Sequence, residues 1–146
     1  MGLRGRLDSG IYPFMGSVCY CAALRAAARK TTAVYDAALA PTGVNLAQFS
    51  LLRKIQRAGS VSLSELGRLA ELDRSTVGRN VKVLQRMGLA RVTAGVDQRE
   101  ATVTLDERGL AVLREGGPPW DDAQRKIEAA LGRDDAKHLR RLLDAL

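Results

Sequence analysis

Residues that bind metals or form cross-links are scarce in this sequence. Its 146 residues include one histidine, His138, and two cysteines, Cys19 and Cys21. A structural zinc site needs four such ligands. Helix positions two residues apart point about 200° apart, so the two cysteines cannot bridge each other unless the helix unwinds. We therefore expect no metal, no cofactor and no disulfide between these cysteines.

Long apolar runs and enzymatic motifs are missing as well. No run of 18 apolar residues is present, and the N-terminal segment lacks the continuous apolar region of a signal peptide. We expect a cytoplasmic protein that does not bind membranes. There is no Gly-rich phosphate loop and no acid and base that converge with the single histidine. These absences argue against an enzyme.

Positive charge is plentiful and unevenly placed. The formal net charge is +7, with +4 on residues 1–35, +1 on 36–71, +4 on 72–99 and −2 on 100–146. Two concentrated basic segments suit a polyanionic partner such as nucleic acid. The length and the 46% hydrophobic composition are enough for one domain with its own core.

The second basic segment contains an amphipathic helix that starts after Asp73 and ends at Gly88. Its apolar stripe consists of Val77, Val81 and Leu84 at helical spacing. Opposite the stripe lie a hydroxyl and three cations, Ser75, Arg79, Lys82 and Arg86. Such a face suits the DNA major groove, where cations meet phosphates and arginine pairs with guanine edges.

Predicted elements on both sides of this helix complete a winged helix-turn-helix. Ser62 and Glu65 fit a capping box that opens a short helix, and only a tight turn separates it from the basic helix. Two β-prone runs follow, residues 89–93 and 100–105, and form a hairpin, the wing. Asp97 and Arg99 are expected at its tip, where an arginine reaches the minor groove.

Further helices are predicted at both ends of the chain. One covers residues 18–40, and a second runs from an Asn45 cap to about residue 57. Asp106 is expected to cap a helix that is either split or sharply kinked at residues 116–119, Gly-Gly-Pro-Pro, because proline removes a backbone donor. The last helices are rich in leucine and have little of their own chain to pack against. We therefore expect a dimer.

These residues resemble the MarR family of bacterial transcriptional regulators over about residues 18–146. The most specific pieces are residues 72–77 and the wing signature D-x-R-x5-L-[TD]-x-x-G, present as Asp97, Arg99, Leu105, Asp106 and Gly109. Residues 35–43 are similar to the end of the family's first helix. The resemblance implies a mainly α protein with a small β wing (α+β), a winged helix-turn-helix with N- and C-terminal dimerisation helices.

The resemblance also implies an organisation and a function. Residues 1–17 are then an extension, 18–57 and 106–146 the helical dimerisation region, and 58–105 the winged helix-turn-helix region. The homodimer is expected to bind double-stranded DNA at a pseudo-palindromic operator, as a repressor released by a small aromatic ligand. A protein-interaction module and a nonspecific architectural DNA binder are the alternatives of another class; the exposed cations disfavour the first.

The residues predicted to contact DNA are Arg74, Ser75, Thr76, Arg79, Asn80, Lys82, Arg86, Asp97 and Arg99. Arg79 is expected to contact bases, and Arg74, Lys82 and Arg86 to contact phosphates. Asp97 is expected to orient Arg99.

Two kinds of signal remain open from the sequence. Cys21 precedes Tyr35 by 14 residues, as do the reactive cysteine and tyrosine of the family's organic-hydroperoxide regulators, although Leu46 replaces their second tyrosine. Since 14 helical residues span about 21 Å, such a pair would have to form across two subunits. A buried, small apolar role is the alternative for Cys21.

The second open signal is a small aromatic effector. Arg25, Arg29, Tyr35 and Trp120 are the candidates to line a pocket for it. Trp120 is alternatively a core anchor.

Overall fold

The computed structural model describes residues 19–95 and 101–146 and is mainly helical with one small sheet, as predicted. The predicted extension, residues 1–17, lies outside the described residues. In chain order the elements are α1 (Tyr20–Leu39), the 3-10 turn η1 (Ala40–Thr42), α2 (Leu46–Ala58), β1 (Val61–Ser62), α3 (Leu63–Ala70), α4 (Arg74–Arg86), β2 (Ala90–Thr93), β3 (Thr102–Leu105), α5 (Glu107–Leu131) and α6 (Arg133–Asp144).

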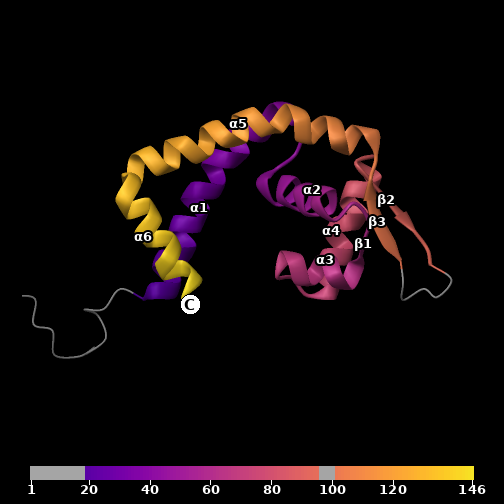
Figure 1. Ribbon diagram of the computed structural model, residues 1–146, viewed down its shortest axis with the longest axis horizontal. Coiled ribbons are helices and arrows are strands. Elements are labelled where there is room, and N and C mark those ends of the chain that lie inside the picture. The colour runs from indigo at the N-terminus through magenta and orange to yellow at the C-terminus, as the bar shows by residue number, and fades with distance from the viewer. Residues whose placement is uncertain (1–18, 96–100) are drawn as a thin grey trace, which may run out of the picture.

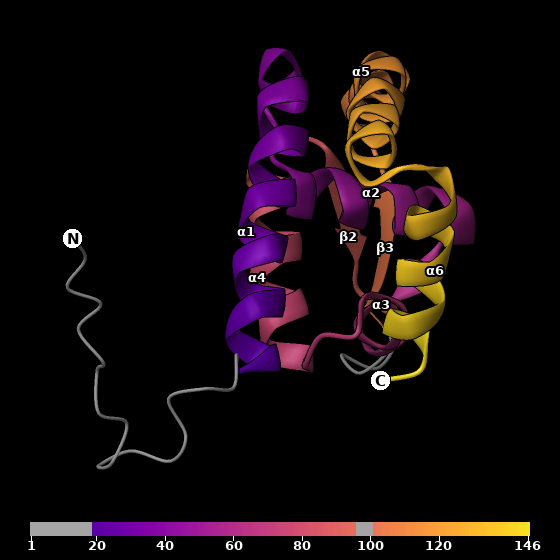
Figure 2. The ribbon, with the colours of Figure 1, turned by 90° about the vertical axis from the view of Figure 1, so that its left-hand side faces the viewer.

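Helix α5 spans the molecule and connects its two ends (Figure 1). At one end it follows β3 next to the group formed by α2, α3, α4 and the sheet, which we call the winged lobe. At the other end of α5 the chain turns at Gly132 into α6, and α1 packs along the length of α5. Figure 2 shows α1 and α6 on opposite sides of this second end.

The core sits in the winged lobe. Fully buried side chains from three helices and the sheet meet there, including Phe49, Leu52, Ile55, Leu66, Val77, Val81, Leu84 and Val103. The sheet is antiparallel with strand order β1-β3-β2, and Val103 pairs with Val61 on one side and Val92 on the other. Strand β1 was not predicted from the sequence, because two residues are too short to show an alternating pattern.

The predicted split at residues 116–119 is wrong, because α5 continues from Glu107 to Leu131 with Pro118 and Pro119 inside it. Tertiary packing holds the helix together on both sides of the prolines. Gly116 is buried against α1 and α2, so closely that a Cβ there would lie 2.5 Å from Phe49 Cε2 and 3.1 Å from Leu39 Cδ2. Because Gly116 has no side chain, α5 can approach these helices closely. The free energy gained by this packing outweighs the loss of the two backbone N–H donors.

The predicted helix caps are partly confirmed. Asn45 forms a complete capping box with Gln48 at the start of α2. Ser62 accepts a hydrogen bond from Glu65 N at 3.1 Å, but the Glu65 carboxylate binds Arg68 instead of returning to Ser62. Asp106 stands at the cap position of α5 without capping it. Its carboxylate instead forms an ion pair of 2.8 Å with Arg91 on β2.

Candidate nucleic-acid interface

Helix α4 is fixed in the winged lobe by one buried stripe. Val77, Val81 and Leu84 are at most 1% exposed and turn the opposite face of the helix outward. Asp73 caps the first turn, as predicted, and accepts a hydrogen bond from Thr76 N at 2.9 Å. At the far end Gly88 adopts a positive φ of 70°, which favours glycine and ends the helix.

The outward face of α4 gathers the residues predicted to contact DNA. Arg74, Ser75, Arg79, Lys82 and Arg86 are exposed, while Thr76 and Asn80 are half-buried. A shallow hollow along this face is lined by Arg79, Lys82, Val83, Gln85 and Arg86. Gln85 was not predicted. Its side-chain amide has the donor and acceptor pair that suits an adenine edge. Because Gln85 follows Lys82 by three residues, it lies on the same helix face, and this spacing could have predicted its place there.

A compact hydrogen-bond cluster forms at the N-terminus of α4. The Ser75 hydroxyl donates to Asp73 Oδ1 and the Thr76 hydroxyl to Asp73 Oδ2, both at 2.6 Å. Arg79 Nη2 donates to Thr76 Oγ1 at 3.1 Å. Hydrogen bonds from the Ser75 hydroxyl, the Thr76 hydroxyl and the Thr76 backbone hold the pKa of Asp73 well below its usual range. The carboxylate therefore stays ionised at neutral pH.

The end of the wing signature fastens α5 to the sheet. A Cβ on Gly109 would lie 2.1 Å from the Leu89 carbonyl oxygen, so only glycine fits there. The same carbonyl accepts a hydrogen bond from Asp106 N at 3.1 Å. These signature residues are therefore explained by packing inside the chain. The signature's first two residues, Asp97 and Arg99, lie outside the described residues.

Aromatic residues meet where α1, α2 and α5 converge. Tyr35 stacks on Trp120 with ring centroids 5.6 Å apart, and the Arg53 guanidinium carbon lies 4.2 Å from the centre of the Trp120 ring. The Tyr35 hydroxyl donates to Gln124 on α5. Trp120 is half-buried and packs against the core, which agrees with its predicted role as a core anchor.

Polar residues of α5 and α6 extend this aromatic group. Gln124 donates to Glu128 at 3.1 Å, and Glu128 also pairs with Arg140 on α6. The pKa of Tyr35 is raised by burial, an effect that nearby Arg140 opposes and Glu128 reinforces.

The candidates for an effector site fall into two places. Tyr35 and Trp120 are in contact, whereas Arg25 and Arg29 lie with exposed Cys19 and Cys21 around a separate hollow at the start of α1. Cys21 is exposed in the single chain, so the buried role expected for it remains a prediction that needs a second chain.

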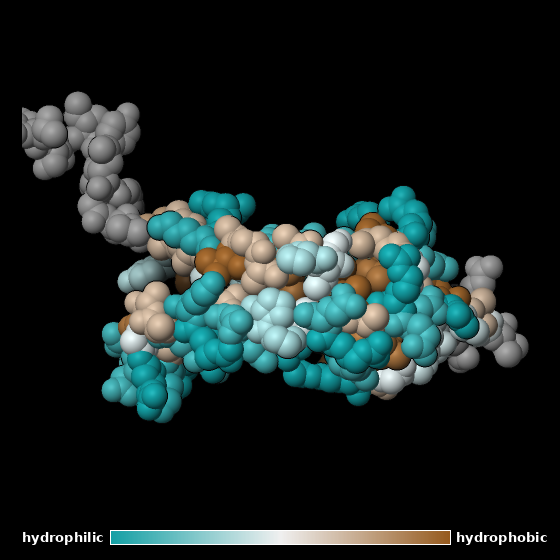
Figure 3. Space-filling model, turned by 90° about the horizontal axis from the view of Figure 1, so that it is seen from above, coloured by the Kyte–Doolittle hydropathy of each residue, from teal (hydrophilic) through white to brown (hydrophobic). Residues whose placement is uncertain are grey.

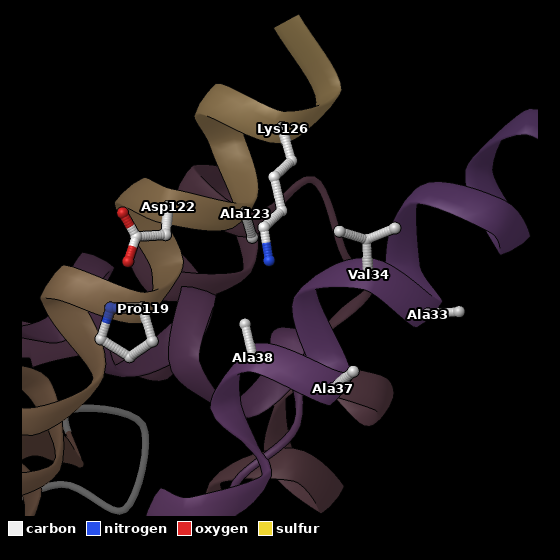
Figure 4. A pocket seen from close by; sticks show the side chains of 8 residues that line it. All are labelled: Ala33, Val34, Ala37, Ala38, Pro119, Asp122, Ala123 and Lys126. Carbon is white, nitrogen blue, oxygen red and sulfur yellow. The ribbon is translucent and has the colours of Figure 1, made fainter. Parts of the chain in front are cut away.

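A third hollow lies between parts of α1 and α5 and is shown in Figure 4. Its α1 wall carries only small apolar side chains, while Asp122 and Lys126 stand on the α5 wall with Pro119 and Ala123. None of the predicted effector candidates lines it.

Among residues 19–95 and 101–146, no helix combines the length and the hydrophobicity that spanning a membrane requires. No group of three or more histidine, cysteine, aspartate or glutamate side chains in that part of the chain is placed to hold a metal ion.

The chain is similar to known transcriptional regulators. The MarR family model matches residues 42–100. The chain is 27% identical over 112 residues to the HTH-type transcriptional repressor Rv2887 of Mycobacterium tuberculosis, covering 76% of this chain and 81% of that protein. All of these proteins are regulators rather than enzymes, as the sequence predicted.

Solved structures extend the similarity to the whole fold. The M. tuberculosis transcriptional regulator MosR, crystallised in complex with DNA, is 35% identical over 88% of this chain and 98% of that one, with a TM-score of 0.72. A variant of E. coli MarR complexed with operator DNA matches the fold with a TM-score of 0.79 at 21% identity over 86% of this chain and 91% of that one. The protein with this sequence and structure is therefore a winged-helix transcriptional regulator that belongs to the MarR family.

Proposed function

We propose that this regulator binds double-stranded DNA sequence-specifically through α4 and represses transcription. One observation carries the proposal: a buried apolar stripe fixes α4 so that Arg74, Ser75, Arg79, Lys82 and Arg86 are exposed together. Support comes from MosR, which was crystallised with DNA, and from Rv2887, which is named a repressor.

The residues of this face are proposed to divide between two tasks. Arg79 contacts base edges, because arginine pairs with guanine O6 and N7 and its side chain is held by Thr76. Arg74, Lys82 and Arg86 contact phosphates, and Asn80 lies at the edge of the contact. Arg99, oriented by Asp97, is proposed to contact the minor groove beside it.

Selection of bound sequences from a random duplex pool tests this division. Arg79→Ala should reduce the preference for the selected site over random DNA by about 10- to 100-fold. Lys82→Ala should weaken binding to both DNAs equally and lower the slope of log affinity against log salt by about 1. A pool from which no sequence is enriched would instead support the nonspecific architectural binder.

The DNA-bound form is proposed to be a homodimer on a pseudo-palindromic operator. Helix α6 exposes Leu139, Leu142 and Leu143 at 38%, 54% and 44% of their surface, and α1 exposes Leu24 at 40%. A second copy of the chain provides matching apolar surface for these helices.

Release from DNA is proposed to follow binding of a small aromatic ligand. The Tyr35 and Trp120 rings, with Arg53 against them, offer stacking surface and a cation where α1, α2 and α5 converge. Addition of salicylate or benzoate should displace labelled operator from the native protein and less from Trp120→Leu. Equal displacement from both proteins would contradict a role for Trp120.

A thiol-based signal is the second candidate, because Cys21 is exposed beside Arg25 and Arg29. Peroxide oxidises an accessible cysteine thiol to a sulfenic acid with release of water. Peroxide should then release DNA from the native protein and from Cys19→Ser, and not from Cys21→Ser. Unchanged DNA binding after oxidation of the native protein would eliminate this candidate.

A further inference from the structure

The cluster at the start of α4 uses more hydrogen bonds than a helix cap needs. A cap requires one side-chain oxygen that accepts from a backbone N–H, and Asp73 meets this requirement through Thr76 N. The same carboxylate also receives the Ser75 and Thr76 hydroxyls at 2.6 Å each. Such short distances are typical of hydroxyl donors to an ionised carboxylate.

These contacts fix which way each hydroxyl donates. An ionised carboxylate has no proton to give, so Ser75 and Thr76 must be the donors. A hydroxyl has a single proton, and in both residues that proton is committed to Asp73. The outward side of each oxygen therefore consists of lone pairs only, and it can accept hydrogen bonds but not donate them.

We infer that Asp73 makes Ser75 a specificity-determining acceptor, which selects a base that presents an exocyclic amino group, cytosine N4 or adenine N6, in the major groove. These amino groups are the hydrogen-bond donors of that groove. Phosphate oxygens, guanine O6 and N7 and thymine O4 are acceptors and do not match Ser75 in this state. The inference rests on the proposed sequence-specific binding by α4.

Thr76 has a different role in the same cluster. Its oxygen accepts a hydrogen bond from Arg79 Nη2 at 3.1 Å, so one lone pair is used inside the protein. Thr76 is therefore a positioning residue that holds Arg79. The other N–H groups of that guanidinium remain available for guanine O6 and N7.

Base analogues in the selected duplex test the Ser75 assignment. The base pair contacted by Ser75 is identified as the position whose preference disappears when selection is repeated with Ser75→Ala. At that position the exocyclic amino group is removed by substituting 2-pyrimidinone for cytosine or purine for adenine. Native protein should lose roughly 3- to 10-fold in affinity, as expected for one neutral hydrogen bond. Ser75→Ala should bind both duplexes equally, which controls for the weakened base pair.

Several outcomes separate the inference from the proposed function. Three results would each overturn the Ser75 assignment while sequence-specific binding stands. They are an affinity loss on removal of N7 by a 7-deazapurine, an equal affinity loss for native protein and Ser75→Ala, and an unchanged selected sequence with Ser75→Ala. If the native protein enriches no sequence, the proposed function fails and this inference fails with it.

The positioning role of Thr76 needs a conservative rescue. Thr76→Val should reduce discrimination for the guanine that Arg79 contacts by about 3- to 10-fold, and Thr76→Ser should restore it because the hydroxyl returns. Far-ultraviolet circular dichroism verifies that both variants fold. Equal discrimination by Thr76→Val and native protein would overturn the positioning role.

Asp73→Gly examines the carboxylate itself. Glycine is tolerated at the N-cap almost as well as aspartate, and without the carboxylate neither hydroxyl is forced to donate inward. The expected result is a folded variant whose affinity for random DNA is kept or raised, while the amino-group dependence at the Ser75 position is lost. Retained amino-group dependence would show that Asp73 does not set the direction of the Ser75 hydroxyl.

Discussion

Tyr35 is one of the residues that attach the first helix to the rest of the chain. Its ring stacks on Trp120, its hydroxyl donates to Gln124, and the tryptophan carries Arg53 of α2 on its ring. One side chain thus contributes an aromatic contact and a hydrogen bond to the junction of three helices. Both interactions depend on burial, which also raises the pKa of the phenol.

The raised pKa of Tyr35 predicts a loss of stability in alkali. In the unfolded chain the phenol ionises near pH 10, whereas in the folded protein it ionises later because burial disfavours the anion. Stability from this group is present below that pH and is lost as the pH rises through the folded pKa. In a titration followed by phenolate absorbance, Tyr35→Phe should remove the late-titrating phenol, the one whose ionisation burial delays.

Tyr20 provides the matched control for this titration, because its side chain is 86% exposed. Tyr20→Phe should leave the late-titrating phenol in place. If Tyr35→Phe keeps that phenol, the burial of Tyr35 is not what delays ionisation.

At the residue scale, the sequence was informative about α4 and uninformative about the Tyr35 contacts. The spacing of Val77, Val81 and Leu84 determines which residues face outward, so Arg79 and Lys82 could be placed from the pattern alone. Tyr35 and Trp120 are 85 positions apart. Their stacking depends on how α1 and α5 pack, which no local pattern contains.

Helix α5 is the element on which the arrangement of the molecule depends. It contacts α1, α2, β3 and α6. Figure 3 shows the molecule from above, where hydrophilic side chains interrupt the hydrophobic ones on the surface. Its two adjacent glycines have different surroundings. Gly116 is buried against Phe49, whereas a Cβ on Gly117 would meet nothing within 4 Å.

This difference predicts unequal effects of the same substitution. Gly116→Ala should destabilise the protein by about 1–3 kcal/mol, because the new methyl group forces Phe49 or α5 to shift. Gly117→Ala should change the stability by less than about 1 kcal/mol, because the gain in helix propensity in open space is offset by contact of the new Cβ with the ring of Pro118. Chemical denaturation of both variants measures the two changes. A stabilising Gly116→Ala would mean that close packing of α5 on Phe49 is not required.

At the element scale, the sequence predicted the six α-helices of the described residues but wrongly allowed a split inside α5. Gly-Gly-Pro-Pro is unfavourable in an isolated helix, and local rules therefore predicted a break. The glycine that weakens the helix locally is also the one that permits its closest tertiary contact. Patterns within a segment do not report such a contact, and the same limit hid β1, which exists only because Val61 and Ser62 pair with β3.

The whole molecule places its winged lobe at one end of α5 and α6, with three exposed leucines, at the other (Figure 1). This separation fits a chain that uses one end for DNA and the other for a second copy. The sequence predicted that the leucines of α6 need a partner, because the chain has too few other apolar residues to cover them.

The proposed dimer predicts a specific change in assembly. Leu139→Gln with Leu142→Gln removes two exposed apolar side chains, spaced three residues apart on one side of α6, from the proposed interface. Sedimentation equilibrium should show the native chain as a dimer and this variant as a monomer. Affinity for a duplex with two half-sites should fall by about 100- to 10,000-fold as the linked second contact is lost, while affinity for a single half-site is unchanged.

Leu69→Gln on α3, where the leucine is 37% exposed, is the matched control and should remain dimeric. A double variant that still sediments as a dimer would place the interface elsewhere on the chain.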